Sequence, residues 1–109
     1  MVAEDASFTT DEFAAAVKAE GVSCGAHYIG NPIFLCHDAI RNQRLFGYSH
    51  YPFDYPGANP VTYDENTCPR TQDVLDRLAM PTRPTQFWTE EDVEDVAAAI
   101  RKVSENLNQ

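Results

Sequence analysis

Apolar residues recur at helical spacing in two stretches, one near each end of the chain. The first stretch follows Thr9, which forms a capping-box pattern with Glu12, and it ends before Gly21. The second stretch follows Thr89. Its apolar positions are Val93, Val96, Ala97, Ile100, Val103 and Leu107. Because spacings of three and four residues place side chains on one helical face, the sequence predicts two amphipathic helices.

Two short strands and a third helix are predicted between these helices. Over residues 22–28, alternation places every second side chain from Val22 to Tyr28 on one face of a strand. A second extended piece is expected near residues 79–82. The third helix is expected to begin at Cys68-Pro69, because the first turn tolerates a proline without its N–H group.

In the middle of the chain, the regular helix and strand patterns are interrupted. Residues 47–66 are interrupted by Pro52, Pro56 and Pro60 and predict a loop, whereas residues 33–44 predict a short, irregular helix or turn. So long a loop is usually functional or covered by a partner. The whole pattern predicts one domain over residues 1–109. Its expected fold is two-layer α+β, with helices packed on one face of a small, mostly antiparallel sheet.

The net charge of the chain argues against two classes of partner. The 109 residues carry a net charge of -9, and the pI is about 4.5. Nucleic acid and anionic membranes would repel such a protein, so neither is an expected partner. No signal-peptide pattern or bilayer-length apolar run is visible. The three cysteines form no paired framework, which favours a reducing compartment, and we expect a cytoplasmic protein.

Five short motifs follow one another between residues 11 and 107. They are Phe13 to Val22, His27-Tyr28 with Pro32-Ile33-Phe34, Phe46 to Ser49 with Tyr51 to Phe53, Cys68 to Thr71, and Thr89 to Val93 with Ala99 to Val103. Their order and spacing resemble the C-terminal small domain of the DegT/DnrJ/EryC1/StrS family of PLP-dependent sugar aminotransferases. Each motif alone is weakly specific, and Gln72 stands where the family usually has glutamate. Five motifs in the right order make a strong resemblance.

The resemblance implies a fold and a role. In this family a small domain of the aminotransferase C-terminal type folds beside a large PLP-binding domain, and we expect a homodimer. The family transfers an amino group from glutamate or glutamine to a keto-sugar, typically nucleotide-linked, or to a cyclitol. The small domain would complete the substrate pocket and help to shape the dimer. The alternative is a free-standing, non-catalytic binding or assembly module with the same fold.

The groups that PLP chemistry requires are not recognisable in the chain. Its two lysines, Lys18 and Lys102, lie on predicted surface helices, and no phosphate-binding cradle is present. We therefore expect the large domain to hold PLP and the chain alone to be inactive, with no catalytic residue. Only residues 1–8 precede the first helix, so the family's first strand is short or absent. This shortage favours a truncation over a natural start at Met1, and it predicts an open sheet edge, which favours dimerisation.

The candidate substrate-binding residues are His27, Tyr28 and Asn31. The resemblance implies that the segment after the first strand faces the active-site cleft. Imidazole, phenol and amide groups suit sugar hydroxyls because they form directional hydrogen bonds. The plainer interpretation is that His27 is a polar strand residue and that Tyr28 belongs to the core.

A zinc site is the weaker interpretation of the Cys24-x-x-His27 and Cys36-His37 patterns. Structural zinc usually requires four ligands in two close pairs, whereas the side chains of adjacent Cys36 and His37 would diverge on a helix or strand. Free thiols and surface histidines are favoured instead, and no metal is predicted.

The predicted loop is rich in aromatic residues. They are Tyr48, Tyr51, Phe53, Tyr55 and Tyr63. Aromatic residues are enriched at protein interfaces, so we expect this loop to lie against the large domain or a second subunit. Without those neighbours it would form an exposed apolar patch. The acidic run from Glu90 to Asp95 is explained by compensation of the helix dipole, and no further role is assigned to it.

Overall fold

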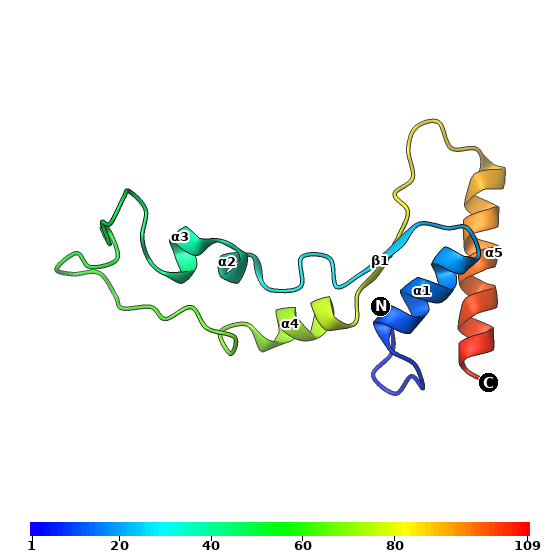
Figure 1. The fold of residues 1–109 in the computed structure, drawn as a ribbon, viewed down its shortest axis with the longest axis horizontal. Coiled ribbons are helices and arrows are strands. Elements are labelled where there is room, and N and C mark those ends of the chain that lie inside the picture. The colour runs from blue at the N-terminus through cyan, green and yellow to red at the C-terminus, as the bar shows by residue number, and fades with distance from the viewer. The chain divides into compact units, whose positions relative to one another are not determined.

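The computed structural model describes residues 1–109, which divide into two compact units. The core unit comprises Met1–Tyr28 and Asp76–Gln109, and the inserted unit comprises Ile29–Leu75. The seven elements are α1 (Thr10–Ala19), β1 (Cys24–Ala26), α2 (Ile33–Cys36), α3 (Asp38–Arg41), α4 (Pro69–Asp76), β2 (Ala79–Pro81) and α5 (Glu90–Leu107) (Figure 1). The coarse prediction of a small α+β protein is confirmed.

Both long helices begin at capping boxes. The Thr9 side chain accepts a hydrogen bond from the Glu12 backbone N–H, and the Glu12 carboxylate accepts one from the Thr9 backbone N–H. Thr89 and Asp92 form the same reciprocal pair at the start of α5. These contacts satisfy backbone donors that have no partner inside the helix. The predicted starts of both helices are confirmed.

The first helix ends as its sequence predicts. Gly21 adopts a φ of 90°, and its N–H donates to the carbonyl of Lys18. A glycine is favoured here because a side chain would be strained in this left-handed conformation. The chain then turns into β1 and reaches the sheet within three residues.

The sheet has two antiparallel strands, and its register pairs Cys24 with Pro81 and Gly25 with Met80. The amide of His27 extends the ladder by donating to the carbonyl of Leu78 at 2.9 Å. The strand predicted over residues 22–28 is therefore shorter than expected. Its regular part ends at Ala26, because the next two residues leave the extended conformation.

The hydrophobic core lies where α1 packs on one face of this sheet and α5 packs against α1. Ala14, Val17, Cys24 and Val103 form the buried cluster. Ala26 and Ala79 pack against it from the two strands, so alternation points Gly25 and Met80 to the opposite face. The predicted packing of a helix on one face of an antiparallel sheet is confirmed for α1, whereas α5 packs mainly against α1.

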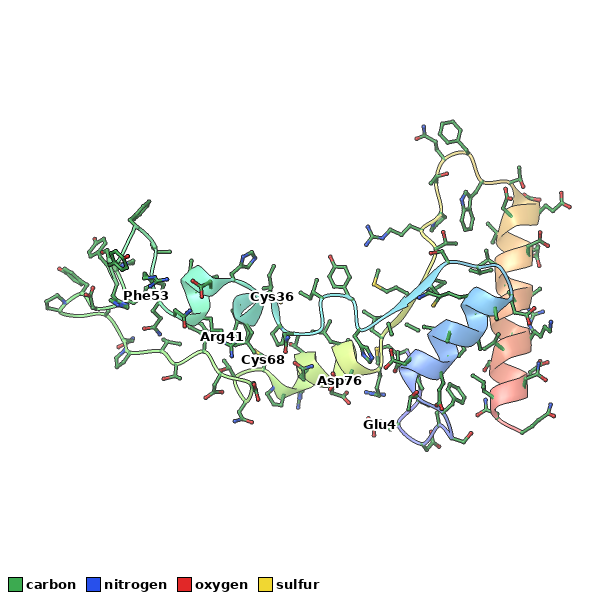
Figure 2. All side chains as sticks on the ribbon, viewed as in Figure 1. Glu4, Cys36, Arg41, Phe53, Cys68 and Asp76 are labelled. Atoms are coloured by element: carbon green, nitrogen blue, oxygen red, sulfur yellow. The ribbon has the colours of Figure 1, made fainter.

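Two further contacts close the core unit. The hydroxyl of buried Thr10 donates to the carbonyl of Asp76 at 2.8 Å. The amide of Val2 donates to the carbonyl of Arg77 at 2.9 Å, and the Arg77 guanidinium also pairs with Glu4. Glu4 lies on the segment before α1 (Figure 2). The segment before α1 thus contributes a buried side chain and a backbone hydrogen bond, although it forms no strand.

The inserted unit consists of short helices and turns. Residues 33–44 hold α2 and α3, each of four residues, and residues 47–66 form turns without helix or strand, as predicted. Phe53 lies on this loop (Figure 2). The buried hydrophobic residues here are Leu35 and Leu75. None of the five helices is both long and apolar enough to cross a bilayer.

Candidate functional site

The exit from β1 has an unusual backbone. His27 and Tyr28 both have positive φ, 64° and 50°, and neither is glycine. A left-handed conformation costs an L-residue with a side chain roughly 1–2 kcal/mol. Two such residues in succession are therefore held by their surroundings. Strain of this kind is often found where a side chain must be aimed at a ligand.

His27 is anchored to the first helix. Its Nε2 lies 3.0 Å from Oδ2 of Asp11, in the first turn of α1. The two side chains are partly exposed, so this contact orients the ring more than it stabilises the fold. Together with the backbone bond to Leu78, it fixes the point at which the chain leaves the sheet.

Tyr28 does not lie on the core face of the strand. Alternation over residues 22–28 places Tyr28 on the same strand face as Cys24 and Ala26, and the plainer interpretation that Tyr28 belongs to the core is wrong. Its side chain is 59 % exposed and lines a groove. The physical reason is the positive φ of His27 and Tyr28, which interrupts the twofold alternation of an extended strand.

The groove lies beside the two strands and has a volume of about 460 Å³. Its main lining residues are Ser23, Gly25, Tyr28, Met80, Thr82 and Arg83. Gly25 and Met80 place it on the sheet face opposite the helix-packed core. A Cβ atom at Gly25 would meet nothing within 4 Å, so the groove floor is open there.

The chemistry of the groove suits a polyhydroxylated ligand. Ser23, Thr82 and Tyr28 supply hydroxyls that both donate and accept hydrogen bonds. The Tyr28 ring and Met80 supply apolar surface. A mixture of apolar surface with a few directional polar groups is typical of small-molecule sites.

Asn31, the third predicted substrate residue, belongs to the inserted unit. Its side chain is exposed, and its backbone carbonyl accepts a weak hydrogen bond from Cys36 Sγ at 3.4 Å. The structure therefore brings His27 and Tyr28 together at the strand exit, while Asn31 lies in the following turn of the chain.

The cysteines have separate surroundings. Cys24 is buried in the core, and this burial raises the pKa of its thiol, so it remains protonated at neutral pH. Cys36 is exposed and Cys68 is half-buried, both in the inserted unit. No group of three or more His, Cys, Asp or Glu side chains is arranged to hold a metal ion.

The two lysines lie on the helices of the core unit. Lys102 Nζ pairs with Glu20 Oε2 at 2.6 Å, which links α5 to the end of α1. Lys18 occupies the last turn of α1 and is exposed. Neither lysine lines the groove beside Tyr28.

The aromatic loop of the inserted unit is largely uncovered. Tyr48 is 90 % exposed and Phe46 is 81 % exposed, and Tyr51 and Tyr55 meet edge to face with ring centroids 6.3 Å apart. Tyr63 differs, because it is half-buried and contacts the ring of Phe34 at 5.6 Å. Exposed aromatic side chains are therefore present, while the partner expected to cover them stays a prediction.

Sequence reasoning missed the other walls of the groove. Ser23, Thr82 and Arg83 come from segments more than fifty residues apart and carry no motif. The available signal was the pairing of the two predicted strands, because an antiparallel register places Ser23 beside the residues that follow Pro81.

Comparison of the chain with protein-family models, curated proteins and solved structures found no match.

Proposed function

We propose that this chain is the small C-terminal domain of a PLP-dependent aminotransferase that acts on a keto-sugar, typically nucleotide-linked, or on a cyclitol. It completes the substrate pocket and the dimer of that enzyme. One observation carries the proposal: a strained turn at His27 and Tyr28 holds an aromatic hydroxyl at a hydroxyl-lined groove. The resemblance of the ordered sequence motifs to sugar aminotransferases supports the assignment of this groove to such an enzyme.

The strain supports a binding role over a purely structural one. A core tyrosine would keep the extended backbone, which costs nothing and buries the ring. Here the chain instead accepts a left-handed Tyr28 and leaves the ring exposed at the groove. His27, held by Asp11, acts as the positioning residue for that turn.

The residues of this chain do not fit PLP. A Schiff-base lysine must offer its amine to the cofactor, whereas Lys102 Nζ pairs with the Glu20 carboxylate and Lys18 is solvent-exposed. No step of the reaction is therefore assigned to the residues of this chain. In the proposal the large domain holds the cofactor, which supplies the electron sink for amino transfer. The part played by this chain is to bind and orient the sugar.

The first test is to sequence the coding DNA upstream of the Met1 codon. The proposal expects an in-frame large domain with a lysine in a PLP-binding context, and amino transfer from glutamate or glutamine by the whole enzyme. A genuine start codon, combined with no amino transfer when the chain is mixed with candidate large domains, would contradict it.

A substitution at Tyr28 tests the site itself. In the whole enzyme, Tyr28→Gly removes the ring and also relieves the left-handed strain, so the fold should not be weakened. We expect KM for the keto-sugar to rise about tenfold, because a stacking and hydrogen-bonding side chain is lost. KM for glutamate should stay constant. Phe87→Ala is the matched control, since Phe87 is exposed in the same unit but does not line the groove.

The alternative is a free-standing, non-catalytic binding or assembly module. The exposed aromatic residues Phe46 and Tyr48 favour it, because uncovered aromatic surface marks interfaces. This alternative predicts that the chain alone forms dimers and that a Phe46→Ser/Tyr48→Ser double variant sediments as a monomer. Equal sedimentation of the parent and the double variant would argue against it.

A further inference from the structure

The groove beside Tyr28 differs in charge from the rest of this acidic chain. The sequence has 17 acidic and 8 basic residues, yet none of the residues that line this groove is an acid. Its one charged residue is Arg83. By contrast, the hollow between α5 and the end of α1 includes Glu20, Asp92 and Asp95. The groove is therefore a local exception to a surface that repels anions.

Arg83 is not used to hold the fold together. Arg44, Arg77 and Lys102 each form an ion pair with a carboxylate, whereas no ion pair or hydrogen bond involves the exposed Arg83 side chain. The residue precedes Pro84, which restricts its backbone to extended conformations. The groove thus has an unpaired guanidinium on a segment that continues directly from β2.

We propose that this groove is an anion subsite that binds the phosphate group of a phosphorylated sugar, with Arg83 on the phosphate. The planar guanidinium offers two parallel N–H donors, a geometry that matches phosphate oxygens. The hydroxyls of Ser23, Thr82 and Tyr28 then meet the sugar, and Gly25 leaves space for its ring. That the ligand is a sugar rests on the proposed function. Arg83 adds a preference for phosphorylated over neutral sugars.

The charge of the whole chain sharpens this assignment. Because a net charge of -9 repels anions, attraction at Arg83 must be local and sensitive to salt. A neutral cyclitol or free sugar would gain little from a guanidinium and would contact only the hydroxyls. The ratio of the two affinities therefore measures the contribution of Arg83.

The experiment is a titration of the isotope-labelled full chain with three probes, followed by amide chemical shifts. The probes are glucose 1-phosphate, glucose and inorganic phosphate. We expect glucose 1-phosphate to bind about tenfold more tightly than either of the others, as a charge-assisted hydrogen bond combined with hydroxyl contacts implies. The shifts should fall on Ser23, Gly25, Met80 and Thr82, and the affinity should drop as salt rises.

Variants identify the residue responsible. Arg83→Gln should abolish the preference for glucose 1-phosphate over glucose. Arg83→Lys should retain part of this preference, because lysine keeps the positive charge but lacks the two parallel N–H donors. Arg101→Gln is the matched control, since it removes one exposed cation from the same unit but not from the groove. Circular dichroism of each variant should match that of the parent chain.

Three results would overturn the inference. They are equal affinities for glucose and glucose 1-phosphate, equal affinities for inorganic phosphate and glucose 1-phosphate, or equal losses from the variants at Arg83 and Arg101. These outcomes are separable from the amino-transfer proposal. Binding by a chain with no aminotransferase partner would support the subsite alone, and transfer to neutral cyclitols alone would remove the subsite while leaving the enzyme.

Discussion

The core unit and the inserted unit are stabilised in different ways. In the core unit, Val17, Cys24 and Val103 are buried together, although they come from α1, β1 and α5. In the inserted unit the buried hydrophobic side chains are Leu35 and Leu75, and many of the backbone hydrogen bonds join residues three or four apart. The first unit is therefore held by contacts between distant segments and the second mainly by turns.

This difference indicates which unit is the more stable. Burial of apolar surface supplies most of the stability of a folded unit, and turn hydrogen bonds replace similar bonds to water. We therefore expect the core unit to fold cooperatively and to support the groove beside Tyr28. The inserted unit, with its exposed Phe46 and Tyr48, should be the less stable of the two.

The sharpest test of this comparison is a pair of core substitutions. Val17→Ala should lower the free energy of unfolding by about 2 kcal/mol, because it leaves a cavity in the buried cluster. Leu35→Ala removes a larger side chain, yet it should cost less than about 1 kcal/mol, because the surrounding turns can relax into the space. Urea unfolding followed by the helical signal at 222 nm, which comes mainly from the core unit, measures how far each substitution destabilises that unit.

Equal losses of unfolding free energy from the two substitutions would contradict the difference between the units. A loss for Leu35→Ala equal to that for Val17→Ala would mean that the two units unfold as one. The 222 nm signal is suited to this question because α1 and α5 contain most of the helical residues and both belong to the core unit.

A smaller effect is expected at the start of α5. Thr89→Ala removes the hydroxyl that accepts from the backbone N–H of Asp92, and loss of such a cap typically costs about 1 kcal/mol. Thr89→Ser keeps the hydroxyl and should be close to neutral. The same urea experiment decides the result, and equal stability of the alanine and parent chains would show that this end of α5 does not contribute to the core unit.

The smallest effect should appear as an acid dependence of the helices. The backbone N–H of Thr9, and secondarily its hydroxyl, holds the pKa of Glu12 below its ordinary value of 4.5. Thr89 does the same to the pKa of Asp92, whose ordinary value is 3.8. A carboxylate with a lowered folded-state pKa stabilises the fold above its ordinary pKa, and this contribution is lost as pH falls through the folded value.

Helical signal should therefore decline slightly as pH falls below these ordinary values. A Glu12→Gln/Asp92→Asn double variant should show a flatter profile over the same range, because neither amide titrates. Parallel acid profiles for the parent and the double variant would assign the decline to other carboxylates.

Much of the fold is readable from local sequence, whereas less of the candidate site is. The capping boxes at Thr9 and Thr89 and the glycine at position 21 depend on neighbours within four residues, so their patterns predict them. His27 and Tyr28 were identified through a resemblance, and their left-handed backbone has no local signature of the kind that glycine gives. The plainer interpretation, which placed Tyr28 in the core, was wrong for this reason.

The sequence by itself determined the helices, the two extended segments and the long loop between them, because each depends on short-range periodicity or on local backbone preference. Only the tertiary structure decided that Ser23, Tyr28, Thr82 and Arg83 share one groove. That grouping depends on the register of β1 against β2 and on two strained residues at the strand exit. Long-range pairing of this kind is set by the burial of the opposite sheet face, which no single stretch of the chain encodes.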